Sequence, residues 1–61
     1  MKFVELHLIK NNKKMAVNPH LITAITVTAD GNTRIYYTDL SQHDDVKEEY
    51  EVVLMRIHDA L

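Results

Sequence analysis

The sequence predicts a small α+β protein: an antiparallel β-sheet of two hairpins, which can curl into a barrel-like form, followed by one C-terminal α-helix. Apolar and polar residues alternate along residues 2–9 and again along residues 22–38, as they do in half-buried strands. From Tyr50 onwards, apolar residues recur at spacings of three and four, which is typical of an amphipathic helix. A chain of 61 residues accommodates one domain, which we take as residues 1–61.

The hairpin at residues 22–38 is the clearest element. Ala29-Asp30-Gly31 can form a three-residue loop in which Gly31 has a positive φ. The predicted strand pairs are then Thr23 with Tyr37, Ile25 with Ile35, and Val27 with Thr33. A two-residue Asp30-Gly31 turn would instead split the aliphatic side chains between the two faces of the sheet, so the hydrophobic pattern favours the longer loop.

A first hairpin is predicted from residues 2–9 and 14–17. Asparagine tolerates positive φ, so Asn11-Asn12 can form a two-residue turn. This turn pairs Leu8 with Met15 and Leu6 with Val17. The inner face of the hairpin is then formed by Val4, Leu6, Leu8, Met15 and Val17.

The segment Asn18-Pro19 predicts one short helical turn between the hairpins. Asparagine is a favoured N-cap, and proline suits the first turn of a helix and ends the preceding strand. Leu21 and Ile22 follow, and we expect them to close one end of the core.

The C-terminal helix presents its apolar positions on one side, namely Tyr50, Val53, Leu54, Ile57 and Leu61. Two starting points are consistent with the residues. Ser41, followed three residues later by Asp44, resembles a capping arrangement and would start the helix early. Alternatively, Val46-Lys47-Glu48 is a last extended segment and the helix starts near Glu49.

These elements define a predicted core and a predicted interface. The core residues are Leu6, Leu8, Val17, Ile25, Val27, Ile35, Tyr50, Val53 and Ile57. Other apolar side chains point away from this core, namely Phe3, Ile9, Tyr36, Val52 and Met55. A small domain without disulfides or metals commonly gains stability by self-association. We therefore expect a homo-oligomer, most simply a dimer, that buries these five residues.

Composition argues against several classes of function. The chain has no cysteine and one serine, Ser41, and its four histidines lack the short paired spacing of structural zinc sites. The acidic residues at 44–51 suit the start of a helix better than a metal site. We therefore expect no catalytic residues, no metal and no cofactor, and so no enzyme. No apolar run is long enough for membrane insertion, and we expect a cytoplasmic location.

Two functions remain open from the residues. The first is a protein-interaction or accessory module that acts as a homo-oligomer with an unknown protein partner. The alternative is a nucleic-acid-binding module, based on outward Tyr36 and Phe3 and on the hairpin lysines Lys10, Lys13 and Lys14. The net charge of −2 makes this alternative the weaker one.

Several motifs occur in a familiar order: Val17-Asn18-Pro19, Leu21-Ile22, Thr33-Arg34-Ile35-Tyr36-Tyr37-Thr38-Asp39, Val46-Lys47-Glu48-Glu49-Tyr50-Glu51-Val52-Val53, and Ile57. This order resembles the small bacterial FlbD-like proteins, which include a flagellar, swarming-motility group and many uncharacterised chromosomal and phage relatives. Residues 40–45 replace a tight glycine-containing turn, and Glu49 stands where serine or threonine is usual. The resemblance implies a short strand at residues 46–48 and a helix that starts near Glu49.

Overall fold

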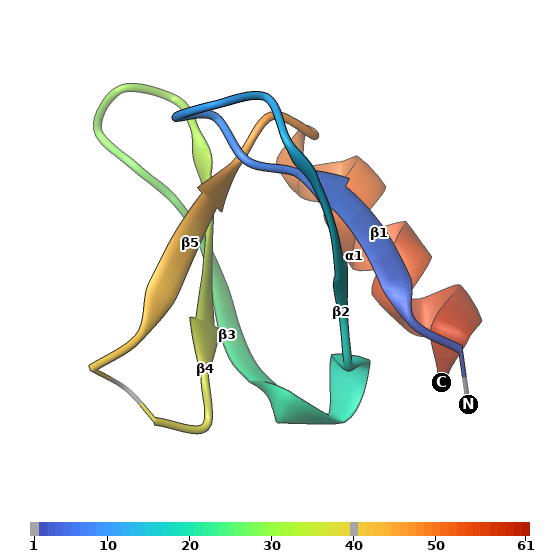
Figure 1. The fold of residues 1–61 in the computed structure, drawn as a ribbon. Coiled ribbons are helices and arrows are strands. Elements are labelled where there is room, and N and C mark those ends of the chain that lie inside the picture. Colours follow the sequence, from blue (N-terminus) through green and yellow to red (C-terminus); the bar gives the residue numbers. More distant parts are fainter. Residues whose placement is uncertain (1, 40) are drawn as a thin grey trace.

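The computed structural model describes residues 2–39 and 41–61 and has an α+β fold, as the sequence predicts. Its elements in chain order are β1 (Val4–His7), β2 (Lys14–Val17), the 3-10 turn η1 (Pro19–Leu21), β3 (Ile22–Val27), β4 (Thr33–Tyr37), β5 (His43–Val46) and α1 (Tyr50–Ala60). The β1–β2 hairpin and the antiparallel sheet β3–β4–β5 stand opposite one another, with η1 between β2 and β3 and with α1 behind β1 (Figure 1).

The two sheets meet along β1 and β5. Leu8 forms an isolated antiparallel bridge with Val46. The backbone N–H of Ile9 donates to the Asp45 carbonyl at 3.1 Å, and that of Lys47 donates to the His7 carbonyl at 2.8 Å. The helix contacts both β1 and β3. The sheets curl towards each other but do not close into a barrel, so the barrel-like option does not apply.

The β3–β4 hairpin has the predicted loop. Gly31 has φ 85°, and its N–H donates to the Thr28 carbonyl at 2.9 Å. Val27 pairs with Thr33 and Ile25 with Ile35, as the hydrophobic pattern predicts. The predicted Thr23–Tyr37 pair is wrong, because a bulge between Ile22 and Ala24 pairs these two residues with Tyr37 and Tyr36. Ile22 and Ile25 are three residues apart and would lie on opposite faces of a regular strand. The extra residue of the bulge brings them to the same face, so that both pack against the core.

The register of the first hairpin differs from the prediction. Leu6 pairs with Met15 and Val4 with Val17, because the loop is longer than Asn11-Asn12 alone. Leu8 N–H donates to the Lys13 carbonyl, Asn12 N–H donates to the Leu8 carbonyl, and Asn12 has φ 59°. The correction slides one strand by two residues, and a shift by an even number keeps every side chain on its predicted face.

The turn η1 forms as predicted, and it leaves Leu21 outside the core. The Asn18 side chain accepts a hydrogen bond from the His20 N–H at 3.0 Å, and Pro19 occupies the first turn. Leu21 is 51% exposed and does not close the core, whereas Ile22 is half-buried against it.

Strand β5 lies earlier in the chain than predicted. The strand covers His43–Val46 rather than residues 46–48, and α1 starts at Tyr50 with Glu49 as N-cap, which rules out the early start at Ser41. Two acidic side chains of β5 find partners on β4. The guanidinium of Arg34 donates to both carboxylate oxygens of Asp45, and the Tyr37 hydroxyl donates to Asp44 at 2.6 Å.

The core cluster consists of Val4, Leu6, Val17, Ile35, Val46, Val53 and Ala60. Of the predicted core residues, Leu6, Val17, Ile35 and Val53 are buried, and Ile25 and Ile57 pack half-buried against them. Leu8 and Tyr50 are half-buried outside this cluster. Val27 was placed in the core wrongly, because it is 58% exposed at the outer edge of its sheet.

Replacing Gly31 with alanine should lower the free energy of unfolding by about 1–2 kcal/mol, because an L-residue is strained at this positive φ. A Cβ at this position would meet no other atom within 4 Å, so the cost comes from the backbone alone. Gly31→Asn is the control, since asparagine tolerates positive φ and should cost less. Urea unfolding measures both, and equal losses would contradict the loop conformation.

Replacing Glu49 with aspartate should raise the free energy of unfolding by about 0.5–1 kcal/mol. Glu49 is the N-cap of α1, and its side chain makes no capping hydrogen bond. Aspartate keeps the negative charge at the helix start but is short enough to accept from the backbone N–H groups of the first turn. The control is Glu51→Asp, at the second residue of the helix, which should not raise the free energy of unfolding. Thermal and urea unfolding compare the two variants.

Candidate protein-interaction surface

The five predicted interface residues do not gather into one patch. Phe3, Ile9 and Met55 are exposed, and Tyr36 and Val52 are half-buried. Phe3 precedes β1 and Ile9 follows it, so the two lie at opposite ends of an extended segment. Tyr36 lies on β4, and the other two lie on α1. The oligomer predicted from these residues stays a prediction.

Tyr36 belongs to the outer face of the three-stranded sheet, which is polar. Its ring lies 5.6 Å from the His43 ring between centroids, and the two residues pair across β4 and β5. The next pair along the strands is Arg34 with Asp45, whose side chains form a two-pronged ion pair. The hydrogen bonds from Arg34 keep the pKa of the Asp45 carboxyl below its usual range. The Arg34 guanidinium is therefore engaged within the sheet.

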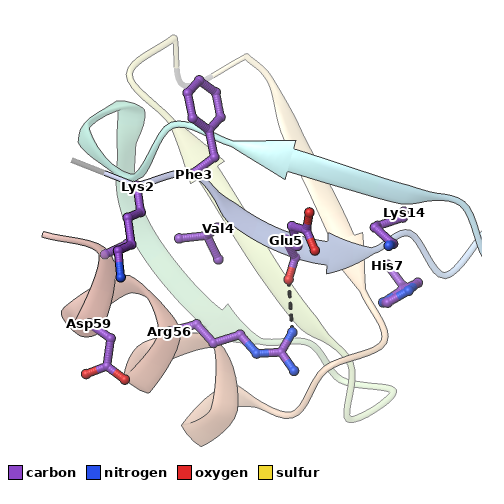
Figure 2. Close-up of a pocket in the computed structure, with 9 residues that line it drawn as sticks. Lys2, Phe3, Val4, Glu5, His7, Lys14, Arg56 and Asp59 are labelled. Atoms are coloured by element: carbon purple, nitrogen blue, oxygen red, sulfur yellow. Dashed lines mark hydrogen bonds between the residues drawn. The ribbon is translucent and has the colours of Figure 1, made fainter.

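Phe3 borders a shallow hollow of about 580 Å³ beside β1 (Figure 2). His7 and charged side chains of both signs surround it, namely Lys2, Glu5, Lys14, Arg56 and Asp59. Arg56 reaches from α1 to β1, where its Nη1 donates to the Glu5 backbone carbonyl at 2.9 Å. The Phe3 ring points away from Arg56. The hollow thus combines mixed charge with one aromatic group at its margin and lacks a strong preference for either sign of ligand.

A polar cluster at Glu48 joins β1 to the start of α1. The Glu48 carboxylate accepts from the His7 backbone N–H at 2.9 Å and lies 2.8 Å from the His7 ring nitrogen Nδ1. It also accepts from Arg56 Nη1 at 3.3 Å. Burial alone would raise the pKa of the Glu48 carboxyl, but the hydrogen bonds from His7 outweigh it and leave this pKa below its usual range. The cluster therefore holds a charged carboxylate between β1 and the helix.

The backbone of the same residue reaches the other sheet. The hydroxyl of Thr33, a buried residue of β4, donates to the Glu48 carbonyl at 2.7 Å. The side chain and the carbonyl of Glu48 thereby hold the two sheets and the helix in one arrangement. We assign this cluster a structural role, since its hydrogen bonds join β1 to the segment before α1, and no buried side-chain polar atom of the described residues lacks a partner.

The largest difference between the predicted and the observed surface is at the sheet edge formed by β3. β3 is the terminal strand of its sheet, and β4 is its only strand partner among the described residues. Val27, expected in the core, is 58% exposed here. Between β3 and α1 lies an apolar groove of about 210 Å³ lined by Ile22, Thr23, Ala24, Ile25, Tyr50, Leu54 and Ile57. Leu54 is 44% exposed, although it belongs to the apolar stripe of the helix.

The sequence contains a signal for this edge that the hydrophobic pattern did not reveal. Natural edge strands are usually protected by charges, prolines or bulges. β3 has the sequence ITAITV, which carries no charge and no proline, and its bulge lies at its first residues. The edge strand of the other sheet, β2, begins with Lys14. Lys13 and Lys10 lie in the loop just before it. The charge-free segment therefore distinguishes β3 from β2 as a surface for strand pairing.

A second apolar hollow, of about 600 Å³, lies between β2 and the end of β4. It combines apolar Met15, Val17, Leu21 and Tyr37 with polar Thr38, Asp39 and Gln42. Burial and the hydrogen bond to Asp44 raise the pKa of the Tyr37 hydroxyl.

Within residues 2–39 and 41–61, no three His, Asp or Glu side chains are grouped to hold a metal ion. No helix in these ranges combines the length and the apolar character needed to cross a membrane.

Replacing Glu48 with glutamine should lower the free energy of unfolding at neutral pH by about 1 kcal/mol or more, because charge-assisted hydrogen bonds are lost. A carboxyl with a lowered folded-state pKa stabilises the protein above its unfolded-state pKa, and this stabilisation disappears as the pH falls through the folded-state value. The difference between wild type and Glu48→Gln should therefore shrink as the pH is lowered from about 7 to about 3.

Glu49→Gln is the matched control for this series, because the neighbouring glutamate is exposed and makes no side-chain capping bond. Urea unfolding at several pH values compares the three proteins. A pH-independent loss for Glu48→Gln would contradict a stabilising role for the charge.

Comparison with known proteins adds no relative to this picture. No protein-family model matches the sequence, and neither the curated proteins nor the solved structures that were compared with it gave a match. The resemblance to the FlbD-like proteins therefore stays a prediction, and the functional conclusion below depends on the surface of the molecule.

Proposed function

We propose that this chain is a small interaction module without catalytic activity, which acts as a homo-oligomer, most simply a dimer. One observation supports this proposal above all: an uncharged edge strand lies beside an apolar groove on the surface. The exposed Val27 and Leu54 belong to this surface, on β3 and α1 respectively. As an accessory module, the oligomer would present its remaining surface to a protein partner.

The energetic reason is the small core. Seven residues form the buried apolar cluster, while large hydrophobic side chains stay exposed. Fully burying one such side chain stabilises a protein or complex by roughly 1.5–3 kcal/mol. Domains of this size without disulfides or metals have little stability in reserve, so covering Val27 and Leu54 with another chain is favourable.

The nucleic-acid alternative has less support. On the outer sheet face, half-buried Tyr36 pairs with His43, and the next β5 residue on this face is the acidic Asp45. Arg34, the cation nearest in the strand register, is bound to Asp45. Binding to phosphates requires cations that are free to contact them. We therefore favour a protein partner over a nucleic acid.

We also propose a cytoplasmic location and no enzymatic role. The composition supports the location, since small secreted domains are commonly held together by disulfides and this chain has no cysteine. Ser41, the one serine, donates its hydroxyl to Asp39 at 2.7 Å in an exposed loop. The hydrogen bonds from Ser41 keep the pKa of the Asp39 carboxyl below its usual range, so this carboxylate is a poor base for activating the serine.

The oligomer can be tested by light scattering coupled to gel filtration over a dilution series. The monomer has a mass of 7.1 kDa, and the mass should approach twice this value as the concentration rises. Leu54→Glu should shift the equilibrium towards monomer, because the new charge would be buried at the interface. Leu21→Glu is the control, since Leu21 is similarly exposed but belongs to η1 and not to the β3 edge or α1. A monomeric wild type up to several hundred micromolar would contradict the proposal.

A further inference from the structure

The free edge of β3 exposes specific backbone groups. In an antiparallel pair, every second residue directs its N–H and C=O towards the partner strand. Thr28 N–H donates to the Asn32 carbonyl at 2.8 Å across the hairpin. The backbone N–H and C=O groups of Thr26 and Ala24 therefore also point towards β4. Those of Ile25 and Val27 point in the opposite direction, away from β4 at the free edge of the sheet. Among the described residues, no other strand pairs with this edge.

The side chains beside these groups are apolar. Ile25 and Val27 share the inner face, where Ile25 lines the groove next to Leu54 of α1. Val27 is 58% exposed, so its own chain does not cover it. An occupant that satisfies both the backbone and the side chains must be an extended strand with apolar residues at alternate positions.

A second copy of β3 has these properties. In an isologous contact each patch meets itself, so a charged patch would be opposed by its own charge. The strand Ile22–Val27 has no charged residue, and self-pairing therefore meets no electrostatic penalty along the strand. It also alternates Ile25 and Val27 with threonine, so the apolar faces of two copies coincide when the strands run antiparallel.

The usable length of the strand selects the register. A bulge interrupts pairing between Ile22 and Ala24, and the loop after Thr28 ends the strand. Ile25 and Val27, whose backbone groups point away from β4, must both pair between the bulge and the loop. Only a two-fold axis at Thr26 allows this in each copy. An axis at Val27 would place Ile25 opposite Ala29 of the loop, and an axis at Ile25 would place Val27 opposite the bulged Thr23.

We propose, on the basis of the function above, that two copies of the chain associate by antiparallel pairing of their β3 strands about a two-fold axis at Thr26. Ile25 of one copy then lies opposite Val27 of the other, and each such pair exchanges two N–H···O bonds. The three-stranded sheets of the two copies become one continuous sheet. The second copy's Val27 is placed beside Ile25, on the side of the groove that contains Leu54.

The register predicts which residues can be cross-linked. Thr26 faces the second copy's Thr26 in a non-hydrogen-bonded pair, in which Cβ atoms are about 4.5–5.5 Å apart, close enough for a disulfide. The chain contains no cysteine, so Thr26→Cys introduces a single thiol. Under mild oxidation, most of the protein should migrate as a covalent dimer on a non-reducing gel.

Ala24→Cys is the matched control on the same face of the same strand. In this register Ala24 lies opposite the second copy's Thr28, so Ala24→Cys alone should not cross-link. An equimolar mixture of Ala24→Cys and Thr28→Cys should form the heterodimeric disulfide. Cross-linking of Ala24→Cys alone, or of all three variants equally, would overturn the register.

Amide exchange of the unmodified protein provides a second measurement that does not depend on the variants. The Ile25 and Val27 amides should exchange at least about tenfold more slowly at high than at low protein concentration, since dimerisation would protect them. The Lys14 and Ala16 amides of the other edge strand, β2, should not change. A wild-type dimer without Thr26→Cys cross-linking or amide protection would overturn this contact and leave the proposed function standing, whereas a wild-type monomer would overturn both.

Discussion

The arrangement of the whole molecule depends on three consecutive residues between β5 and α1. Val46 pairs with Leu8 of the first hairpin and with Thr33 of the second, and it is almost completely buried. Lys47 N–H donates to the His7 carbonyl. Glu48 binds His7 through its carboxylate and Thr33 through its carbonyl. Each hairpin alone is too small to be stable, and this junction helps to fix the two hairpins and the helix relative to one another.

The position of this junction explains why β3 is left open. The sheets meet along β1 and β5, so β2 and β3 become the two outer strands. α1 packs against β1 and β3 and covers Ile25 in part, but Val27 lies beyond its reach. Lysines accompany β2, whereas β3 carries no charge. The proposed interaction through β3 would use the edge that this closure leaves open, and it would complete a sheet that the monomer leaves unfinished.

The acidic residues near the helix have structural roles in the folded chain. Asp45 binds Arg34, Asp44 accepts from Tyr37, and Glu48 joins His7 and Arg56. Only Glu49 and Glu51 remain at the helix start, where the dipole favours negative charge. The bonds of Asp44 and Asp45 make a strand out of a segment whose composition is that of a loop. On the outer face, the ion pair of Asp45 with Arg34 adds to the polar character of the sheet.

The sequence by itself determined the fold class, the Gly31 loop, the turn at Pro19 and the face on which most core residues lie, because these follow from local periodicity and backbone preference. Only the tertiary structure decided the register of the first hairpin, the position of β5 and the exposure of Val27. A period of two is unchanged when a strand slides by two residues, so it cannot select between registers. β5 lacks an apolar pattern because its side chains are satisfied by residues distant in sequence, such as Arg34 for Asp45. Val27 belongs to the same alternating pattern as Ile25, and it is exposed because no further element among the described residues reaches the end of its strand. Burial of that position depends on which elements are neighbours in space, and periodicity along one strand carries no information about them.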